Sequence, residues 1–200
     1  MTGRQIRRFS LFVFLLFFAV MLLFSALAQS FSPSSLGHLS TMVSHGFEHS
    51  MFSSLLFSPS PLARALGIFL NNLKVLALVL LAALLLRLKS RLGRLVLGYG
   101  ALALFVLLLF VNAIIGGLVV TAIARAHHAA WPLVMLAGIL PHGVFEIGAY
   151  AFGIGLAVAA SRPAGVRQRP LYYTLLPIGL LLVAALVESF VTPLLLRLVT

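Results

Sequence analysis

The chain has 200 residues, of which 62% are hydrophobic and only 8% are charged, and its mean hydropathy is +1.17. This composition is far from that of soluble globular domains and indicates an integral membrane protein with no room for a sizeable water-soluble domain. No cysteine is present, which excludes disulfides, thiol catalysis and cysteine metal sites. The formal net charge is +11, so the positions of the basic residues need an explanation.

Five segments are long and apolar enough to cross a bilayer, which requires roughly 20 mostly apolar residues. They cover residues 9–28, 64–86, 95–120, 131–160 and 171–196. We therefore predict an all-α fold, a polytopic membrane helix bundle of five transmembrane helices with an additional external amphipathic helix. Residues 1–200 form a single membrane domain, with a first span at 9–28, an external loop and helix at 29–61, and a four-helix core at 62–200.

The basic residues explain the charge, because they cluster in alternate loops between these segments. Ten of the fourteen are Arg4, Arg7, Arg8, Arg87, Lys89, Arg91, Arg94, Arg162, Arg167 and Arg169. By the positive-inside rule these loops are cytoplasmic, which predicts a multi-pass cell-membrane protein with a cytoplasmic N-terminus and an external C-terminus. No basic stripe with interleaved aromatic residues occurs, so the expected partner is the lipid bilayer and no nucleic acid.

The first span has some features of a cleavable signal peptide. It begins with basic residues, continues as an apolar run and ends with Ala26-Leu27-Ala28. The apolar region of a signal peptide is about 7–15 residues long, whereas the run from Phe9 to Leu27 is nearly unbroken. We therefore expect this segment to be retained as a membrane anchor.

The interval from Gln29 to Pro61 is the only long polar stretch, and it contains a helical pattern. Apolar residues recur at spacings of three or four, at Leu36, Leu39, Val43, Phe47, Met51 and Leu55. This stripe predicts an amphipathic helix in the membrane interface or against the bundle. Within it, "HGFEH" formally matches the zinc motif H-x-x-E-H, but no third ligand follows. His45 and His49 are therefore weak metal candidates, and a plain amphipathic helix is the preferred interpretation.

Polar residues inside the spans are the main functional signal. A charged side chain at the centre of a span costs about 2.5–3.5 kcal/mol on insertion scales. His142 and Glu146 are four residues apart and share a helix face, as do Glu188 and Thr192. Because polar residues fall at similar depths in four spans, we predict one buried cluster. Its members are Asn71, Asn72, Lys74, Asn112, His142, Glu146, Glu188 and Thr192, with Lys74 as counter-ion for Glu146 or Glu188.

Prolines and glycines lie beside these polar residues. Pro141 lacks an N–H group, so we expect the fourth helix to kink or restart at "LPHG". Gly143 allows a neighbouring helix to approach closely. Pro193 directly follows Thr192 in the fifth span. The proline and glycine positions therefore predict helix breaks and close packing around the cluster.

Two interpretations of the cluster stay open. It either joins the helices through hydrogen bonds or lines a pathway for a substrate, an ion or protons. An enzyme is not favoured, because no serine lies in the cluster. We therefore predict no catalytic residue, no cofactor and no metal, with His142 and Glu146, alongside Glu188, as weak metal candidates only.

Three segments resemble the signature regions of a known membrane-protein family. They are "FLNNLKVL" at 69–76, "LPHGVFEIGAYAFGIGLA" at 140–157 and "ALVESFVTP" at 185–193. In this order and spacing they are similar to the stage II sporulation protein M family, although Gly148 stands where many members have proline. The resemblance implies a bundle of five or six helices. It also implies a membrane anchor or scaffold for envelope-remodelling proteins. The sporulation protein itself works in this way with peptidoglycan-degrading proteins.

The expected function is therefore a membrane scaffold, with envelope proteins or a second copy of the chain as partners. The alternative is a transporter or channel for a small molecule or an ion, using the buried polar cluster.

Overall fold

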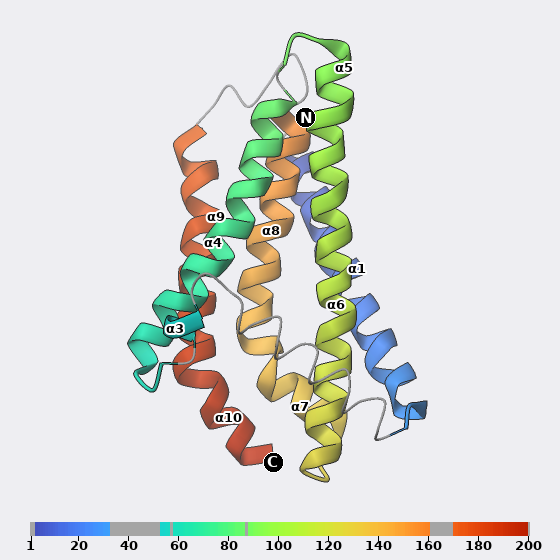
Figure 1. Cartoon of the computed structure of the whole chain (residues 1–200), viewed down its shortest axis with the longest axis vertical. Helices are drawn as coiled ribbons and strands as arrows, with labels where there is room; N and C mark the ends of the chain where they lie inside the picture. The colour runs from blue at the N-terminus through green and yellow to red at the C-terminus, as the bar shows by residue number, and fades with distance from the viewer. Residues whose placement is uncertain (1–2, 33–52, 57, 87, 161–169, 200) are drawn as a thin grey trace.

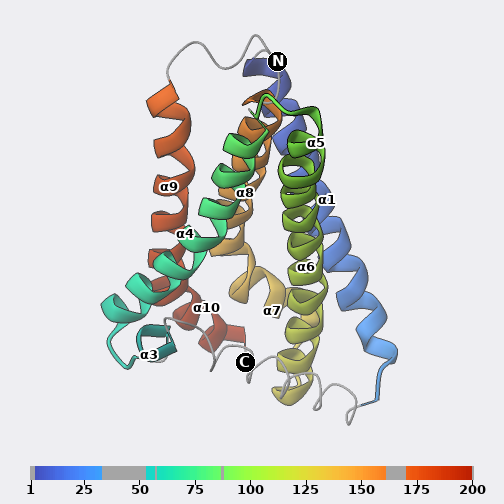
Figure 2. The ribbon, with the colours of Figure 1, turned by 45° about the horizontal axis from the view of Figure 1, so that its top comes forward.

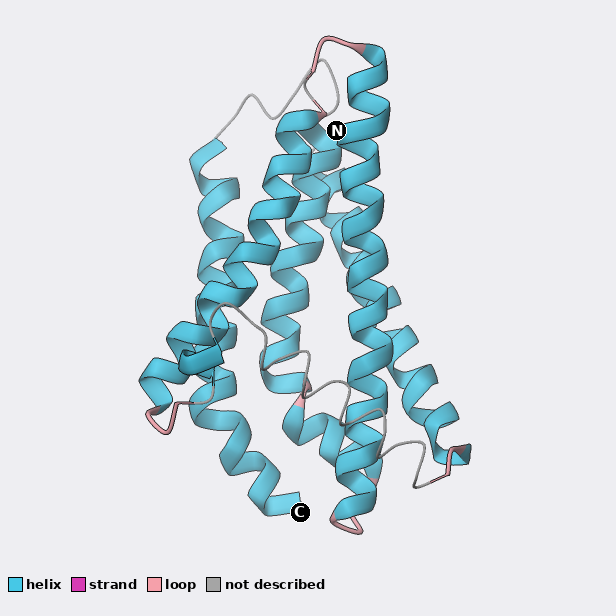
Figure 3. Ribbon diagram, viewed as in Figure 1, coloured by secondary structure: helices cyan, strands magenta, loops and turns pink. Residues whose placement is uncertain are grey.

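The chain forms a bundle of long helices that run roughly side by side (Figure 1). The computed structural model describes residues 3–32, 53–56, 58–86, 88–160 and 170–199. Every regular element in this part of the chain is helical (Figure 3). Five helical segments are long and apolar enough to cross a membrane, which confirms the predicted all-α bundle with five spans.

The long helices follow one another up and down the bundle (Figure 1). The first two spans are α1 (Gly3–Leu27) and α4 (Pro61–Leu85), with the short helices η1 (Ala28–Ser30) and α3 (Ser53–Leu56) between them. The third is continuous through α5 (Arg91–Gly93), the π-helix η2 (Arg94–Tyr99) and α6 (Gly100–Ala126). The remaining elements are α7 (Trp131–Gly138), α8 (Leu140–Ala160), α9 (Pro170–Leu186), the π-helix η3 (Val187–Val191) and α10 (Thr192–Val199).

Helix α8 lies at the centre of the bundle (Figure 2) and packs against α1, α4 and α9. In the apolar stretch of this span 61% of the residues are buried, against 22% to 33% in the other four spans. Its sequence explains this position, because glycine and alanine recur along it and allow close approach on several sides. Helix α8 as a whole is therefore shielded from lipid more completely than the other four spans.

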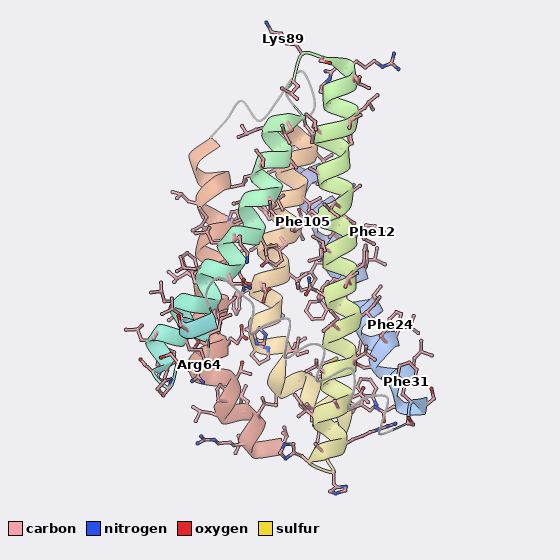
Figure 4. All side chains as sticks on the ribbon, viewed as in Figure 1. Phe12, Phe24, Phe31, Arg64, Lys89 and Phe105 are labelled. Carbon is pink, nitrogen blue, oxygen red and sulfur yellow. The ribbon has the colours of Figure 1, made fainter. Side chains whose placement is uncertain are left out.

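Two serines define where helices begin. The Ser60 hydroxyl accepts a hydrogen bond from the Ala63 amide at 3.5 Å, and Pro61 occupies the first turn of α4, as is common at helix N-termini. Ser90 caps α5 in the same way through Gly93. The third span consequently starts before residue 95 and covers 36 residues, or about 54 Å of helix. Its basic end extends beyond a hydrocarbon layer of about 30 Å, in the half that contains Lys89 (Figure 4).

The fourth predicted span, residues 131–160, is in fact two helices. Helix α7 ends at Gly138 and α8 begins at Leu140. Pro141 has no N–H group to donate to the carbonyl of Ala137, so the helical hydrogen-bond pattern is interrupted at this point. Only the α8 part is a candidate span, whereas α7 packs against α6 and α10. The break therefore shortens the predicted transmembrane segment.

The predicted amphipathic helix falls largely outside the described residues, as do His45 and His49. Its last turn is described as α3, which packs on α4. The contact is close, because a Cβ atom added at Gly67 would lie 2.8 Å from Leu55 Cβ. Glycine at position 67 is therefore what allows α3 to rest on α4.

Helix α1 packs into the bundle along α6 and α8, with Phe17 and Met21 buried. The closest approach is at Gly117 of α6. A Cβ atom added there would lie 2.6 Å from the Met21 carbonyl oxygen and 2.9 Å from the Ser25 amide nitrogen. These are backbone atoms that cannot rotate away, so only glycine permits the observed contact.

We therefore expect Gly117→Ala to force α1 and α6 apart and to lower the free energy of unfolding by about 1–3 kcal/mol. Gly148→Ala is the matched control in another span, because an added Cβ atom there meets nothing within 4 Å. The control should be neutral or slightly stabilising, since alanine favours helix. Thermal unfolding of the two variants in detergent measures the difference, and equal stabilities would contradict the close contact.

Candidate functional site

The candidate site lies where α8 meets the fifth span. His142 and Glu146 are one turn apart on α8, and Glu188 belongs to the π-helix η3, which contacts α8. Each offers one nitrogen or oxygen atom that could bind a metal, and these three atoms lie within 4.8 Å of one another. The structure thus brings together His142, Glu146 and Glu188, three titratable members of the predicted cluster.

Hydrogen bonds connect this group to neighbouring helices. Nδ1 of His142 lies 3.3 Å from the Thr192 hydroxyl oxygen. The Glu146 carboxyl group is within hydrogen-bonding reach of the Asn72 and Tyr150 side chains. The Tyr150 hydroxyl also donates to the backbone carbonyl of Asn72 at 3.5 Å. Polar side chains thus tie α8 to α4 on one side and to the fifth span on the other.

A cavity of about 230 Å³ lies beside the group and is bounded by α1, α4, α6 and α8. Six of its lining residues are polar: Asn71, Asn72, Asn112, His142, Glu146 and Tyr150. Its other walls include Phe105, whose ring packs edge-to-face on Tyr150 at 5.8 Å between centroids. This volume is large enough for several water molecules and offers the polar partners that buried water needs.

Two predicted members of the cluster lie at or beyond its edge. Asn112 lines the cavity, but its amide nitrogen donates to the Leu108 carbonyl of its own helix at 2.9 Å. Lys74 is exposed, and its ammonium group donates to the Asn71 side-chain oxygen at 3.1 Å. Lys74 does not line the cavity, so the structure does not place it as the counter-ion of Glu146 or Glu188.

The cation beside the site is Arg64, in the first turns of α4 (Figure 4). Its positive charge interacts electrostatically with the Glu188 carboxyl group. Its Nε atom is buried and has no hydrogen-bond partner among the described residues. Arg64 is the first residue of the predicted span 64–86, and nothing in the sequence indicates that this end of α4 lies opposite η3.

Tyr150 was also missed, although a signal for it existed. His142, Glu146 and Tyr150 follow one another at intervals of four, so they lie along one face of α8. A tyrosine one turn beyond a half-buried carboxyl group can donate a hydrogen bond to it, which identifies Tyr150 as part of the site.

The proline and glycine positions sit around the site. A Cβ atom added at Gly143 would lie 3.7 Å from Phe18 Cζ of α1 and 3.3 Å from Ile139 Cγ2, so the α1 side chain reaches α8 there. Pro193 is the second residue of α10 and directly follows the π-helix η3. Its missing N–H group removes the α-helical partner of the Ser189 carbonyl. A π-helical turn before a proline is therefore compatible with the local backbone chemistry.

A second polar contact joins α1 to α6 near one end of the bundle. The Ser25 hydroxyl donates to the Gly117 carbonyl and the Thr121 hydroxyl contacts the Ser25 carbonyl, each at 3.1 Å. The Arg125 guanidinium then donates to the carbonyls of Phe31 (2.7 Å), Ala28 (3.4 Å) and Gln29. This contact could not be predicted from the sequence, because serine and threonine near a helix end are common and carry no specific signal.

Comparison with known proteins tests the family resemblance of the three sequence segments that contribute most of the site. A family model described as stage II sporulation protein M matches residues 10–193. The chain belongs to this family. The match confirms the resemblance that the three motifs indicated, and these motifs contribute Asn72, His142, Glu146 and Glu188 to the site. Searches of curated proteins and of solved structures gave no match.

The geometry predicts different outcomes for two substitutions of Glu146. Glu146→Gln keeps groups that can hydrogen bond with Asn72 and Tyr150, so the thermal stability of the purified, chelator-treated protein should stay close to that of the unsubstituted chain treated in the same way. Glu146→Leu removes the carboxyl partner of the Asn72 side chain, while Tyr150 keeps the Asn72 carbonyl, and should lower the free energy of unfolding by about 1–3 kcal/mol. Thermal unfolding in detergent tests this, and equally stable variants would show that the hydrogen bonds of Glu146 do not support the fold.

Proposed function

We propose that this family member is a membrane scaffold that presents residues 28–60 to envelope-remodelling partners. The observation that carries the proposal is that both ends of this segment are attached to the bundle. At its start, Arg125 of α6 donates to the backbone carbonyls of Ala28, Gln29 and Phe31. A guanidinium with several carbonyl partners fixes the chain direction as α1 ends.

The other end of the segment is held by helix packing. Helix α3 rests on α4, with Leu55 against Gly67, and Ser60 caps the start of α4. The end of α1 and α3 lie in the same half of the molecule (Figure 1). A segment of about 30 residues attached at both ends pays less ordering entropy on binding than a free tail, which suits a partner-binding role.

The proposed orientation places this segment outside the cell. Lys89 (Figure 4) and α5, which begins with Arg91 (Figure 1), lie near the opposite end of the bundle from α3, and the positive-inside rule assigns that end to the cytoplasm. Envelope-remodelling enzymes work on the outer side of the membrane, so the two assignments are consistent.

The orientation is testable with single-cysteine variants, because the chain has no cysteine of its own. We expect a membrane-impermeant thiol reagent to label Ser54→Cys and Thr200→Cys in intact cells, and to label Lys89→Cys only after permeabilisation. Labelling of a Thr200→Cys or Ser54→Cys variant that requires permeabilisation would reverse the topology.

The scaffold role is testable by site-specific photo-crosslinking in cells. A photoreactive residue at Ser54, which is exposed on α3, should capture envelope proteins, whereas one at Leu92 at the opposite end should not. Arg125→Gln removes the carbonyl contacts and should lower the yield at Ser54. Arg197→Gln removes an exposed arginine of α10 and is the matched control, which should leave the yield unchanged. Equal capture at Ser54 and Leu92 would contradict the proposal.

Transport is the second candidate, and the polar cavity favours it. Six polar residues line a space of about 230 Å³ between the helices, and polar side chains at membrane depth are typical of substrate and ion pathways. Solute or ion flux into proteoliposomes that depends on Glu146, combined with no capture at Ser54, would favour transport over the scaffold.

A further inference from the structure

We infer that His142, Glu146 and Glu188 form a binding site for one divalent first-row transition metal ion. The donor set is one imidazole nitrogen and two carboxylate oxygens, which suits zinc, manganese or iron. Metal bonds to these ligands are about 2.0–2.2 Å long, so ligands of one ion lie at most about 4.4 Å apart. The three candidate atoms lie within 4.8 Å of one another, so small side-chain rotations bring them to one ion.

The surrounding hydrogen bonds are those that orient metal ligands. A ligating histidine usually engages a polar group through its other ring nitrogen, and ligating carboxylates are themselves hydrogen bonded. Here Thr192 lies 3.3 Å from Nδ1 of His142, and Asn72 and Tyr150 lie within hydrogen-bonding reach of Glu146. The cluster therefore has outer partners that fix the positions of two of its three ligands, which is independent of the ligand spacing itself.

Space for a further ligand adjoins the cluster. His142 and Glu146 both line the cavity of about 230 Å³, together with the amides of Asn71 and Asn72. Three protein ligands with one open position are typical of sites where the metal binds water or an exogenous group, whereas structural zinc sites are closed by four protein ligands. The site is thus built to bind a metal whose open position faces the cavity.

The charges of the site also favour a cation. Two carboxyl groups lie among apolar helices, where an ionised group is tolerated only if it is paired or coordinates a metal. Arg64 is the basic side chain whose charge acts on Glu188, while Lys74 is exposed and bonds Asn71. Among the described residues, Glu146 has amide and hydroxyl neighbours but no ion pair, so a divalent ion would supply the missing positive charge.

The test uses the untagged full chain in lipid nanodiscs, treated with a chelator and then titrated with Co²⁺. We expect one ion per chain by elemental analysis, a d–d absorption spectrum, and displacement by Zn²⁺. His142→Gln, Glu146→Gln and Glu188→Gln should each weaken binding about a hundredfold or more, and Thr192→Val about tenfold, as outer partners do. Substitution of His128, in the turn between α6 and α7, by glutamine is the control and should leave binding unchanged.

Several results would overturn the site. They are absence of Co²⁺ binding by the unsubstituted chain, unchanged binding in Glu188→Gln, or loss of binding in a His45→Gln, His49→Gln double variant. Glu188→Asp covers the case in which a glutamine variant does not fold, because it keeps the charge and shortens the ligand. It should retain the fold and change the cobalt spectrum, and an unchanged spectrum would exclude Glu188 as a ligand. None of these readouts depends on partner capture, so the metal site and the scaffold role are tested separately.

Discussion

The constraint on which the structure depends is that lipid offers no hydrogen bonds to a carboxyl group. Glu146 lies midway along the family's central motif, and its helix is the most buried span of the five. Its neighbours Asn72 and Tyr150 supply the polar contacts that the bilayer cannot. Because Asn72 belongs to α4 and Glu146 to α8, satisfying one side chain also fixes the packing of two helices. The central position of α8 and the polar side chains around it thus both follow from the need to give Glu146 hydrogen-bond partners.

Irregular backbone delivers the remaining groups to the same place. The break between α7 and α8 comes two residues before Pro141, so α8 starts just ahead of His142. On the other side, the π-helix η3 carries Glu188 and ends immediately before Thr192 and Pro193. π-Helical turns are rare and often occur at functional sites. Both irregular segments lie next to residues that contact each other between helices, His142 and Thr192. Irregular backbone is tolerated in a membrane where it is buried in protein in this way.

Much of this arrangement could be predicted from sequence because it follows from periodicity. Hydropathy indicated the five spans, and i, i+4 spacing placed His142 with Glu146 and Glu188 with Thr192. The partner of each charge could not be predicted in this way. Lys74 was predicted as the counter-ion from its depth in the span, but its side chain is exposed and donates to Asn71. Arg64 lies in the first turns of α4, which Ser60 caps, and its charge acts on Glu188. The partner of each charge thus depended on how α4 is rotated about its axis and on where it begins. Hydropathy does not indicate either.

The two polar regions of the bundle differ in what they bind, and this difference separates their roles. Near the end of α1, Arg125 donates to backbone carbonyls, so its contacts set the path of the chain whatever side chains follow. In the interior, the polar groups are side chains beside a cavity, so they can exchange one partner for another without altering the backbone. A metal bound there would add its binding free energy to folding and hold α8 against the fifth span. The interior site would then stabilise the same bundle to which the end of α1 is attached, which would serve the proposed scaffold role.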